Sequence, residues 1–158
     1  MANTTDNLKL NIWLEDDVVD FEEVNDNFEK LDSMVMCIES GTKTSACSGG
    51  SSSNATWRYK KYSDGTIEMS SKLELTNLKC NGGSAAPYHS GNVLVNFPFD
   101  LKEVYNVQMH LESNTIGWVS DITDRSILDG VTFRIMGMSS ESTYIYKQVF
   151  INVKGVLK

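Results

Sequence analysis

The chain has 158 residues, 41% of them hydrophobic, and a formal net charge of -7 at pH 7, which allows one core of ordinary size and excludes a disordered composition. Its apolar runs are only a few residues long and its N-terminus, MANTTDNLKL, has no basic and apolar leader, so we expect neither membrane insertion nor a secretion signal. Neither half carries a basic stripe, which argues against nucleic-acid binding.

The acidic residues are concentrated in the first quarter of the chain. Residues 1–40 hold eleven acids and two bases, whereas residues 41–158 hold ten acids and twelve bases. Within the acidic quarter, segment 20–40 places apolar residues three and four positions apart, which is the spacing of one helical face. These residues occupy the a and d positions of a heptad: Phe21, Val24, Phe28, Leu31, Val35 and Ile38.

Both ends of this helix are marked in the sequence. Asp20 and Glu23 have the spacing of a capping box, and Gly41 stands where a left-handed C-terminal cap is expected. The apolar seam is narrow, so it suits another copy of the same helix better than a globular domain. We therefore predict that residues 1–40 form a docking segment and an oligomerisation helix, with packing against the chain's own β body as the alternative.

The next segment, GTKTSACSGGSSSNAT at residues 41–56, is almost free of large side chains. Eleven of its sixteen residues are Gly, Ser or Thr. Because such a composition cannot pack a core, the segment is predicted to be a flexible connector.

Residues 57–158 have the pattern of strands. TWRYKKYSDGTIEMSS indicates a hairpin that turns at Asp64-Gly65 and has Trp57 and Tyr59 in the core. Period-two alternation continues through the segments 92–99, 104–113, 116–122, 130–138 and 142–156. The fold class expected for the body is an antiparallel β-sandwich or jelly-roll-like head, because the strands leave no room for crossover helices.

The three cysteines, Cys37, Cys47 and Cys80, are 10 and 33 positions apart. These spacings match neither a closed disulfide framework nor a zinc site, so we expect thiols in a protein made in a reducing compartment. No metal or cofactor is expected.

Two segments, residues 12–32 and residues 55–75, carry motifs of spaced acidic, amide and aromatic residues. Together they resemble tail-fibre, baseplate and receptor-binding proteins of phages and prophages of Gram-positive bacteria. IWLEDDVVDFEEVNDNFEKLD resembles their N-termini through Asp16, Asp20, Asn25, Asn27, Phe28, Lys30, Leu31 and Asp32. ATWRYKKYSDGTIEMSSKLEL resembles the first strands of their C-terminal β domain through Trp57, Tyr59, Lys61, Tyr62, Gly65 and Glu68. The end of the chain, INVKGVLK, is similar to their closing strand.

This resemblance implies a homotrimeric virion component that is made in the bacterial cytoplasm and built into the tail. It implies that the N-terminal segment, with Trp13 as a docking contact, bundles with its copies and binds other tail or baseplate proteins. The β heads are then presented to a host receptor, which we expect to be a cell-wall saccharide.

No catalytic constellation is recognisable, so we do not expect an enzyme. The sequence has no phosphate-binding glycine loop, no G-x-S-x-G elbow and no H-E-x-x-H motif. Saccharide sites combine an aromatic face with charged or amide groups. Two clusters offer this chemistry, first Trp118 with Asp121, Asp124 and Arg125, and second Tyr88 with His89.

Simpler interpretations of both clusters stay open. The acids can belong to a solvated turn, and Trp118 can be a core residue. Two other functions also remain, namely a structural tail connector without a ligand and a bacterial carbohydrate-binding module or degenerate glycosidase fragment. The last of these predicts a monomer.

Overall fold

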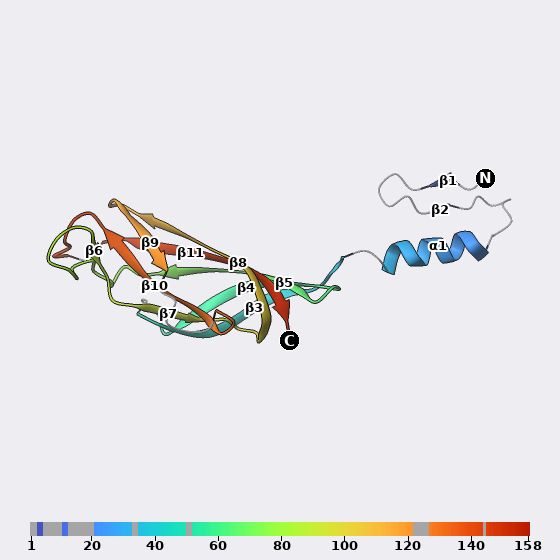
Figure 1. Cartoon of the computed structure of the whole chain (residues 1–158), viewed down its shortest axis with the longest axis horizontal. Coiled ribbons are helices and arrows are strands. Elements are labelled where there is room, and N and C mark those ends of the chain that lie inside the picture. Colours follow the sequence, from blue (N-terminus) through green and yellow to red (C-terminus); the bar gives the residue numbers. More distant parts are fainter. Residues whose placement is uncertain are drawn as a thin grey trace. The chain divides into compact units, whose positions relative to one another are not determined.

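The computed structural model describes residues 3–4, 11–12, 21–32, 35–49, 52–121, 127–143 and 145–158. It divides the chain into two compact units, Met1–Met36 and Cys37–Lys158, and each is considered by itself. Figure 1 shows the helical unit and the β body. Among the described residues, no helix combines the length and the apolar character that crossing a membrane requires.

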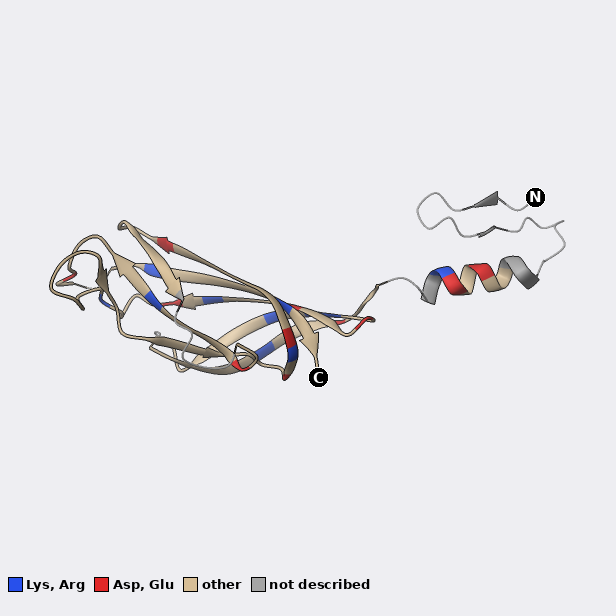
Figure 2. Ribbon diagram, in the orientation of Figure 1, with Lys and Arg blue, Asp and Glu red and all other residues tan. Residues whose placement is uncertain are grey.

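The N-terminal unit contains one helix and a small strand pair. Strands β1 (Asn3–Thr4) and β2 (Asn11–Ile12) pair antiparallel, and helix α1 spans Phe21–Asp32. The helix begins directly after Asp20, as the capping pattern predicts. Its described residues include Asp26, Glu29 and Lys30. Figure 2 shows both acidic and basic positions along this helix.

The predicted C-terminal end of the helix is wrong. The helix stops at Asp32, so Val35 lies after it and Ile38 lies in the first long strand, β3 (Cys37–Ser48). Gly41 is an interior residue of that strand and not a helix cap. The physical reason is backbone pairing, because residues from Cys37 onwards provide the hydrogen-bonding edge that the neighbouring strand needs.

The predicted connector at residues 41–56 is also wrong. Residues 41–48 belong to β3, and residues 54–56 begin β4 (Asn54–Tyr62), which pairs with β3 along almost its whole length. Small hydroxyl residues can follow an extended backbone, and here they also make specific contacts. The Ser45 hydroxyl donates to the backbone carbonyl of Asn96 and accepts a 2.8 Å hydrogen bond from Trp57 Nε1.

The body is mainly β and antiparallel, as predicted, and its strands form one continuous curled sheet. The sheet order is β6-β10-β7-β3-β4-β5-β11-β8, with β9 paired to β10. The two-layered jelly roll is not confirmed by this order. The further strands are β5 (Thr66–Glu74), β6 (Tyr88–His89), β7 (Val93–Asn96), β8 (Leu101–Ser113), β9 (Gly117–Asp121), β10 (Gly130–Gly137) and β11 (Lys147–Leu157).

The core fills the inner face of this curled sheet. Trp57 is fully buried, as predicted, and its ring meets Phe97 edge to face with centroids 5.7 Å apart. Tyr59 is half-buried and packs edge to face on Phe99. The predicted hairpin turn is confirmed, with Gly65 at a φ of 81° between β4 and β5.

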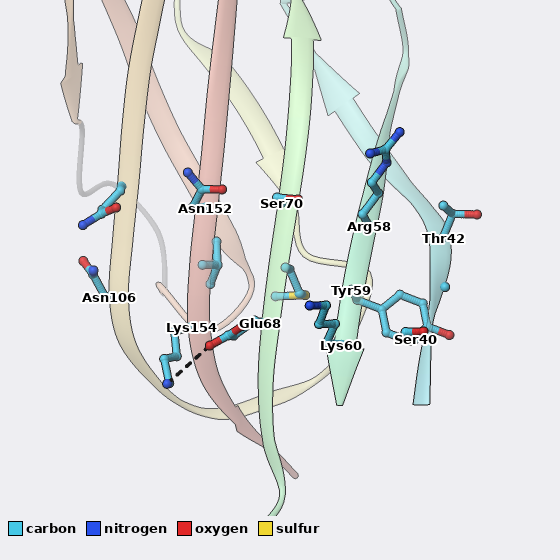
Figure 3. Close-up of a pocket in the computed structure, with 14 residues that line it drawn as sticks. Ser40, Thr42, Arg58, Tyr59, Lys60, Glu68, Ser70, Asn106, Asn152 and Lys154 are labelled. Atoms are coloured by element: carbon cyan, nitrogen blue, oxygen red, sulfur yellow. Dashed lines mark hydrogen bonds and ion pairs between the residues drawn. The ribbon is translucent and has the colours of Figure 1, made fainter. Parts of the chain in front are cut away.

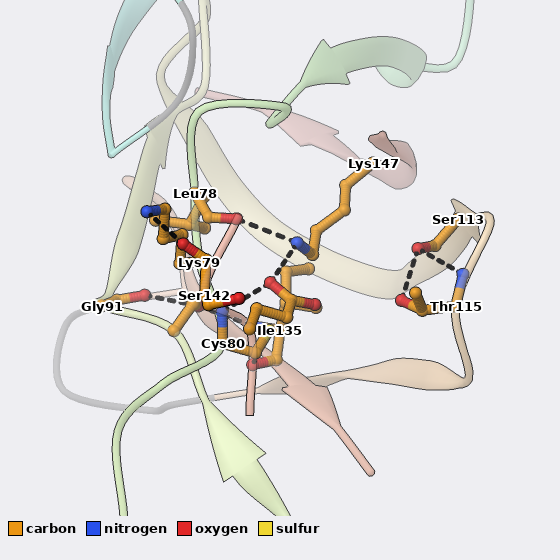
Figure 4. Close-up of polar contacts among 11 residues, drawn as sticks. Leu78, Lys79, Cys80, Gly91, Ser113, Thr115, Ile135, Ser142 and Lys147 are labelled. Atoms are coloured by element: carbon orange, nitrogen blue, oxygen red, sulfur yellow. Dashed lines mark hydrogen bonds and ion pairs between the residues drawn. The ribbon is translucent and has the colours of Figure 1, made fainter. Parts of the chain in front are cut away.

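A buried polar cluster joins the loops at one end of the body (Figure 4). Lys147, at the start of β11, has only 1% of its side chain exposed and pairs with the Glu141 carboxylate at 2.7 Å. Its Nζ also donates to the backbone carbonyl of Leu78 at 2.9 Å. The same oxygen of Glu141 accepts from the backbone N–H of Cys80 at 2.7 Å, so two loops and a strand converge on one ion pair.

The three thiols differ in exposure, which gives a prediction. Cys37 is exposed, whereas Cys47 and Cys80 are buried. Burial, assisted by the Glu141 carboxylate, raises the pKa of Cys80 from an ordinary 9.0 to about 11. In the folded protein we expect a thiol reagent to modify Cys37 rapidly and to reach the buried thiols only on unfolding, as mass spectrometry of the labelled chain would show.

The stability that Cys80 contributes should depend on alkaline pH. A raised folded pKa means that the folded state favours the protonated thiol, so this contribution is complete below pH 9.0 and is lost as the pH rises towards about 11. Cys80→Ala should remove this part of the pH dependence. If the thiol reagent labelled Cys80 as fast as Cys37 in the native protein, the burial of Cys80 would be contradicted.

Candidate functional site

The structure brings Trp118 and His89 onto one face of the sheet. Trp118 of β9 pairs with Met136 of β10, and Met136 pairs on its other side with His89 of β6. Directly paired residues of antiparallel strands point to the same face, and neighbouring strands are about 4.8 Å apart, so the two rings flank Met136. Trp118 is 43% exposed, so it is a surface residue and the core alternative is wrong.

An arginine that the sequence analysis missed lies in the next row of this face. Arg134 pairs with Ser120 of β9, and its Nε donates a 2.6 Å hydrogen bond to Asn92 Oδ1. This bond fixes the guanidinium two residues from Met136 on the same face. The alternation in GVTFRIMGM contains the signal, since Arg134 stands between the buried Phe133 and Ile135 and must point outward.

The position of the His89 ring depends on a glycine. Gly82 forms a β-bridge with His89, and a Cβ on Gly82 would lie 2.4 Å from the ring's Cε1 atom. The imidazole therefore occupies space that only glycine leaves open. Its Nδ1 lies 3.0 Å from the carbonyl oxygen of Ser90, an acceptor, so the neutral ring presents Nε2 as an acceptor itself.

Tyr88, another predicted ligand residue, is not brought to this face. Tyr88 pairs with Gly137, one position along from the Met136–His89 pair, and so points to the opposite face, where it packs against the core. The prediction that Tyr88 and His89 act together is therefore wrong. Asp121 ends β9, and its side chain, like Asp124 and Arg125, lies outside the described residues.

This surface, defined by Trp118, Met136, His89 and Arg134, has the chemistry of a binding site. It combines an exposed indole with a positioned guanidinium and an imidazole, and saccharides present an apolar ring face together with hydroxyls that such groups can bind. Among the described residues, no three His, Cys, Asp or Glu side chains are grouped so that they could hold a metal ion. We name it the Trp118 surface.

The predicted oligomerisation residues are at least partly exposed wherever their side chains are described. Phe28 of α1 is 61% exposed, Val35 57% and Ile38 65%, while Val24 is partly exposed. The side chains of Phe21 and Leu31 lie outside the described residues. No described residue buries these exposed apolar side chains. Helix α1 carries only part of the predicted apolar seam, because Val35 and Ile38 lie after its end.

Comparison with known proteins identifies a similar fold in a solved structure. No protein-family model matches the chain, and no curated protein matches it. Among solved structures, the chain is similar to a C-terminal fragment of the P. aeruginosa R1 pyocin fibre, with a TM-score of 0.51 and 10% sequence identity. The similarity covers 87% of this chain and 32% of that fragment, so the chain spans about a third of its length.

Proposed function

We propose that this chain is a homotrimeric tail or baseplate component of a phage or prophage of Gram-positive bacteria, and that it binds a saccharide of the host cell wall. The observation that carries the proposal is the exposure of the apolar side chains of Phe28 and Val35 in the N-terminal unit of a chain whose fold is similar to that of a pyocin-fibre fragment. Covering each such side chain on association would contribute roughly 1.5 to 3 kcal/mol.

Trimerisation would take place through the N-terminal region. Helix α1 is only 12 residues long, and a helix of that length is marginal on its own. Packing three copies along one axis would cover Phe28 and leave the acidic side chains in solvent. The segment before α1 would bind other tail or baseplate proteins, so that the assembled chain is part of the virion.

The heads would bind without catalysis. We assign saccharide recognition to the Trp118 surface, where the indole would stack on a sugar ring while Arg134 and His89 bind its hydroxyls. Single contacts of this kind are weak. Three heads on one axis would raise the avidity by about 10² to 10⁴ without any new contact, provided that the receptor spacing allows simultaneous binding.

The decisive experiment is the absolute mass of the full chain by light scattering after size exclusion. We expect three times the 17.6 kDa chain mass for the natural sequence and for Asn25→Glu, and the mass of a single chain for Phe28→Glu. Both variants add one negative charge to α1, but Asn25 is an exposed polar residue, whereas Phe28 is an exposed apolar one. The comparison therefore separates the loss of apolar contact from the effect of charge.

Two results would redirect the proposal. A monomeric natural chain at micromolar concentration would remove the trimer and favour a carbohydrate-binding module. A trimer that sediments with none of a panel of purified Gram-positive cell walls would favour a structural connector.

In the cell-wall sedimentation assay, Trp118→Ala should reduce binding. Tyr105→Ala, which removes another exposed aromatic side chain, on β8, should not.

A further inference from the structure

A second surface feature lies on strands that do not contribute to the Trp118 surface. The outer sides of β3, β4, β5, β11 and β8 form a shallow groove of about 620 Å3 (Figure 3). The inner sides of the same strands carry the core, including Trp57, Met69 and Val153. The groove side chains are therefore not needed to fill the interior, and their chemistry can be considered separately from packing.

The strand register arranges the groove side chains in two rows that cross five strands. Each row is a chain of directly paired residues, which point to one face of the sheet. The first row is Thr42, Arg58, Ser70, Asn152 and Gln108. The second row is Ser40, Lys60, Glu68, Lys154 and Asn106.

The charge of the groove is opposite to that of the whole chain. The two rows hold three cations, Arg58, Lys60 and Lys154, and a single acid, Glu68. The Glu68 carboxylate accepts from the Tyr62 hydroxyl at 2.8 Å and pairs with Lys154 at 3.4 Å, and the Tyr62 hydrogen bond is the main cause that holds its pKa below the usual range. Glu68 therefore stays ionised and already has partners.

Two of the cations, Arg58 and Lys60, make no ion pair with a described carboxylate. Both side chains are exposed. A neighbouring row extends the positive surface, because Lys72 lies two positions after Ser70 in β5 and so points to the same face. Lys72 Nζ lies 5.7 Å from the centre of the ring of Phe150, its pairing partner in β11. In a chain of net charge -7, this local excess of positive charge, with three cations and one acid in the two rows, marks a place where an anion would be attracted.

The neutral members of the rows specify the rest of the ligand. Asn152 and Gln108 each offer both a donor and an acceptor, and Ser70 and Thr42 add hydroxyls. Hydroxyl-rich molecules need such mixed partners, whereas an anionic group needs the guanidinium and ammonium donors beside them. The rows cross the strands, so the ligand would be an extended chain and not a single small anion.

We propose that this groove binds an anionic oligosaccharide, one that carries carboxylate or phosphate groups along a hydroxyl-rich chain. Arg58 and Lys60 bind the charged groups, and the amides of Asn152 and Gln108 bind the hydroxyls between them. The inference goes beyond the proposed function, because it concerns a different surface from the Trp118 surface and holds whether or not the chain is a trimer.

Calorimetric titration of the full chain tests the proposal with two matched pairs of probes. The first pair is a galacturonic acid hexamer and its neutral methyl ester, and the second is a phosphomannan oligosaccharide and its dephosphorylated form. We expect binding of at least one charged probe, much weaker binding of its neutral partner, and an affinity that falls as salt is added. The pair that responds identifies carboxylate or phosphate as the anion.

Single substitutions locate the site. Arg58→Gln and Lys60→Gln should each weaken binding of the charged probe about tenfold, because each removes a charge-assisted hydrogen bond. Lys102→Gln removes the same charge from an exposed position of β8 outside the groove and should leave affinity unchanged. Equal urea midpoints would show that all three variants remain folded.

The proposal is overturned if the natural chain binds neither charged probe, if the neutral forms bind equally well, or if Lys102→Gln weakens binding as much as Arg58→Gln. These outcomes are independent of the proposed function. A trimer that binds cell walls but ignores both charged probes would reject the groove alone, and a monomer that binds a charged probe would reject the trimer alone.

Discussion

Replacing Lys147 with Met is expected to lower the free energy of unfolding by about 3 to 5 kcal/mol, since it leaves the Glu141 carboxylate buried without its cation. The side chains of both residues are almost completely buried. The substitution also removes the hydrogen bond that Lys147 donates to the Leu78 carbonyl. Urea unfolding followed by tryptophan fluorescence would measure the loss.

A surface ion pair offers a matched control for this prediction. Lys154→Met removes the cation of the Lys154–Glu68 pair, whose side chains are 53% and 45% exposed, and should cause little change in stability. The double variant Lys147→Met with Glu141→Leu should be less destabilised than the sum of its single variants, because it removes both buried charges together. Equal effects of Lys147→Met and Lys154→Met would refute the buried-pair argument.

Trp57→Ala is expected to lower the free energy of unfolding by about 3 to 5 kcal/mol, because it creates a large cavity in the centre of the curled sheet. Trp57 is fully buried, stacks edge to face on Phe97 and donates its indole N–H to Ser45. The residue thus joins β4 both to β3 and to the segment after β7. Chemical denaturation followed by circular dichroism would measure the change, because the substitution removes a fluorophore.

Two smaller substitutions divide this effect into its parts. Trp57→Phe keeps most of the apolar volume but loses the indole hydrogen bond, and should cost clearly less than Trp57→Ala. Ser45→Ala keeps the ring and removes the hydroxyl that links Trp57 to the Asn96 carbonyl. If Trp57→Ala were no more destabilising than Ser45→Ala, the ring would not be the centre of the core.

The two buried features also support the candidate surfaces. The Lys147–Glu141 pair holds loop residues Leu78 and Cys80, and the Cys80 thiol lies 3.5 Å from the carbonyl of Ile135 in β10, the central strand of the Trp118 surface. Trp57 directly precedes Arg58 of the groove in β4 and points to the opposite, inner face of the sheet. A substitution that destabilises the Lys147–Glu141 pair or the Trp57 site should therefore weaken ligand binding indirectly. For this reason the binding tests substitute exposed residues.

The sequence by itself determined the alternating elements. Period-two patterns located the hairpin around Gly65 and the long strands β8, β10 and β11, because one face of each strand must be apolar when it covers a core. It also located the helix start, at Phe21, and the burial of Trp57. These features depend on neighbouring residues or on the apolar character of single side chains.

Only the tertiary structure decided the features that depend on partners distant in the chain. The segment 41–48 has no apolar alternation, and it is a strand because β4 needs a backbone partner, which sequence spacing does not reveal. For the same reason the helix ends at Asp32 although the heptad pattern continues to Ile38. The Trp118 surface and the groove arise from register across separate strands. No local sequence pattern connects Trp118 with His89, because they are 29 positions apart. The same holds for Arg58 and Asn152, which are 94 positions apart.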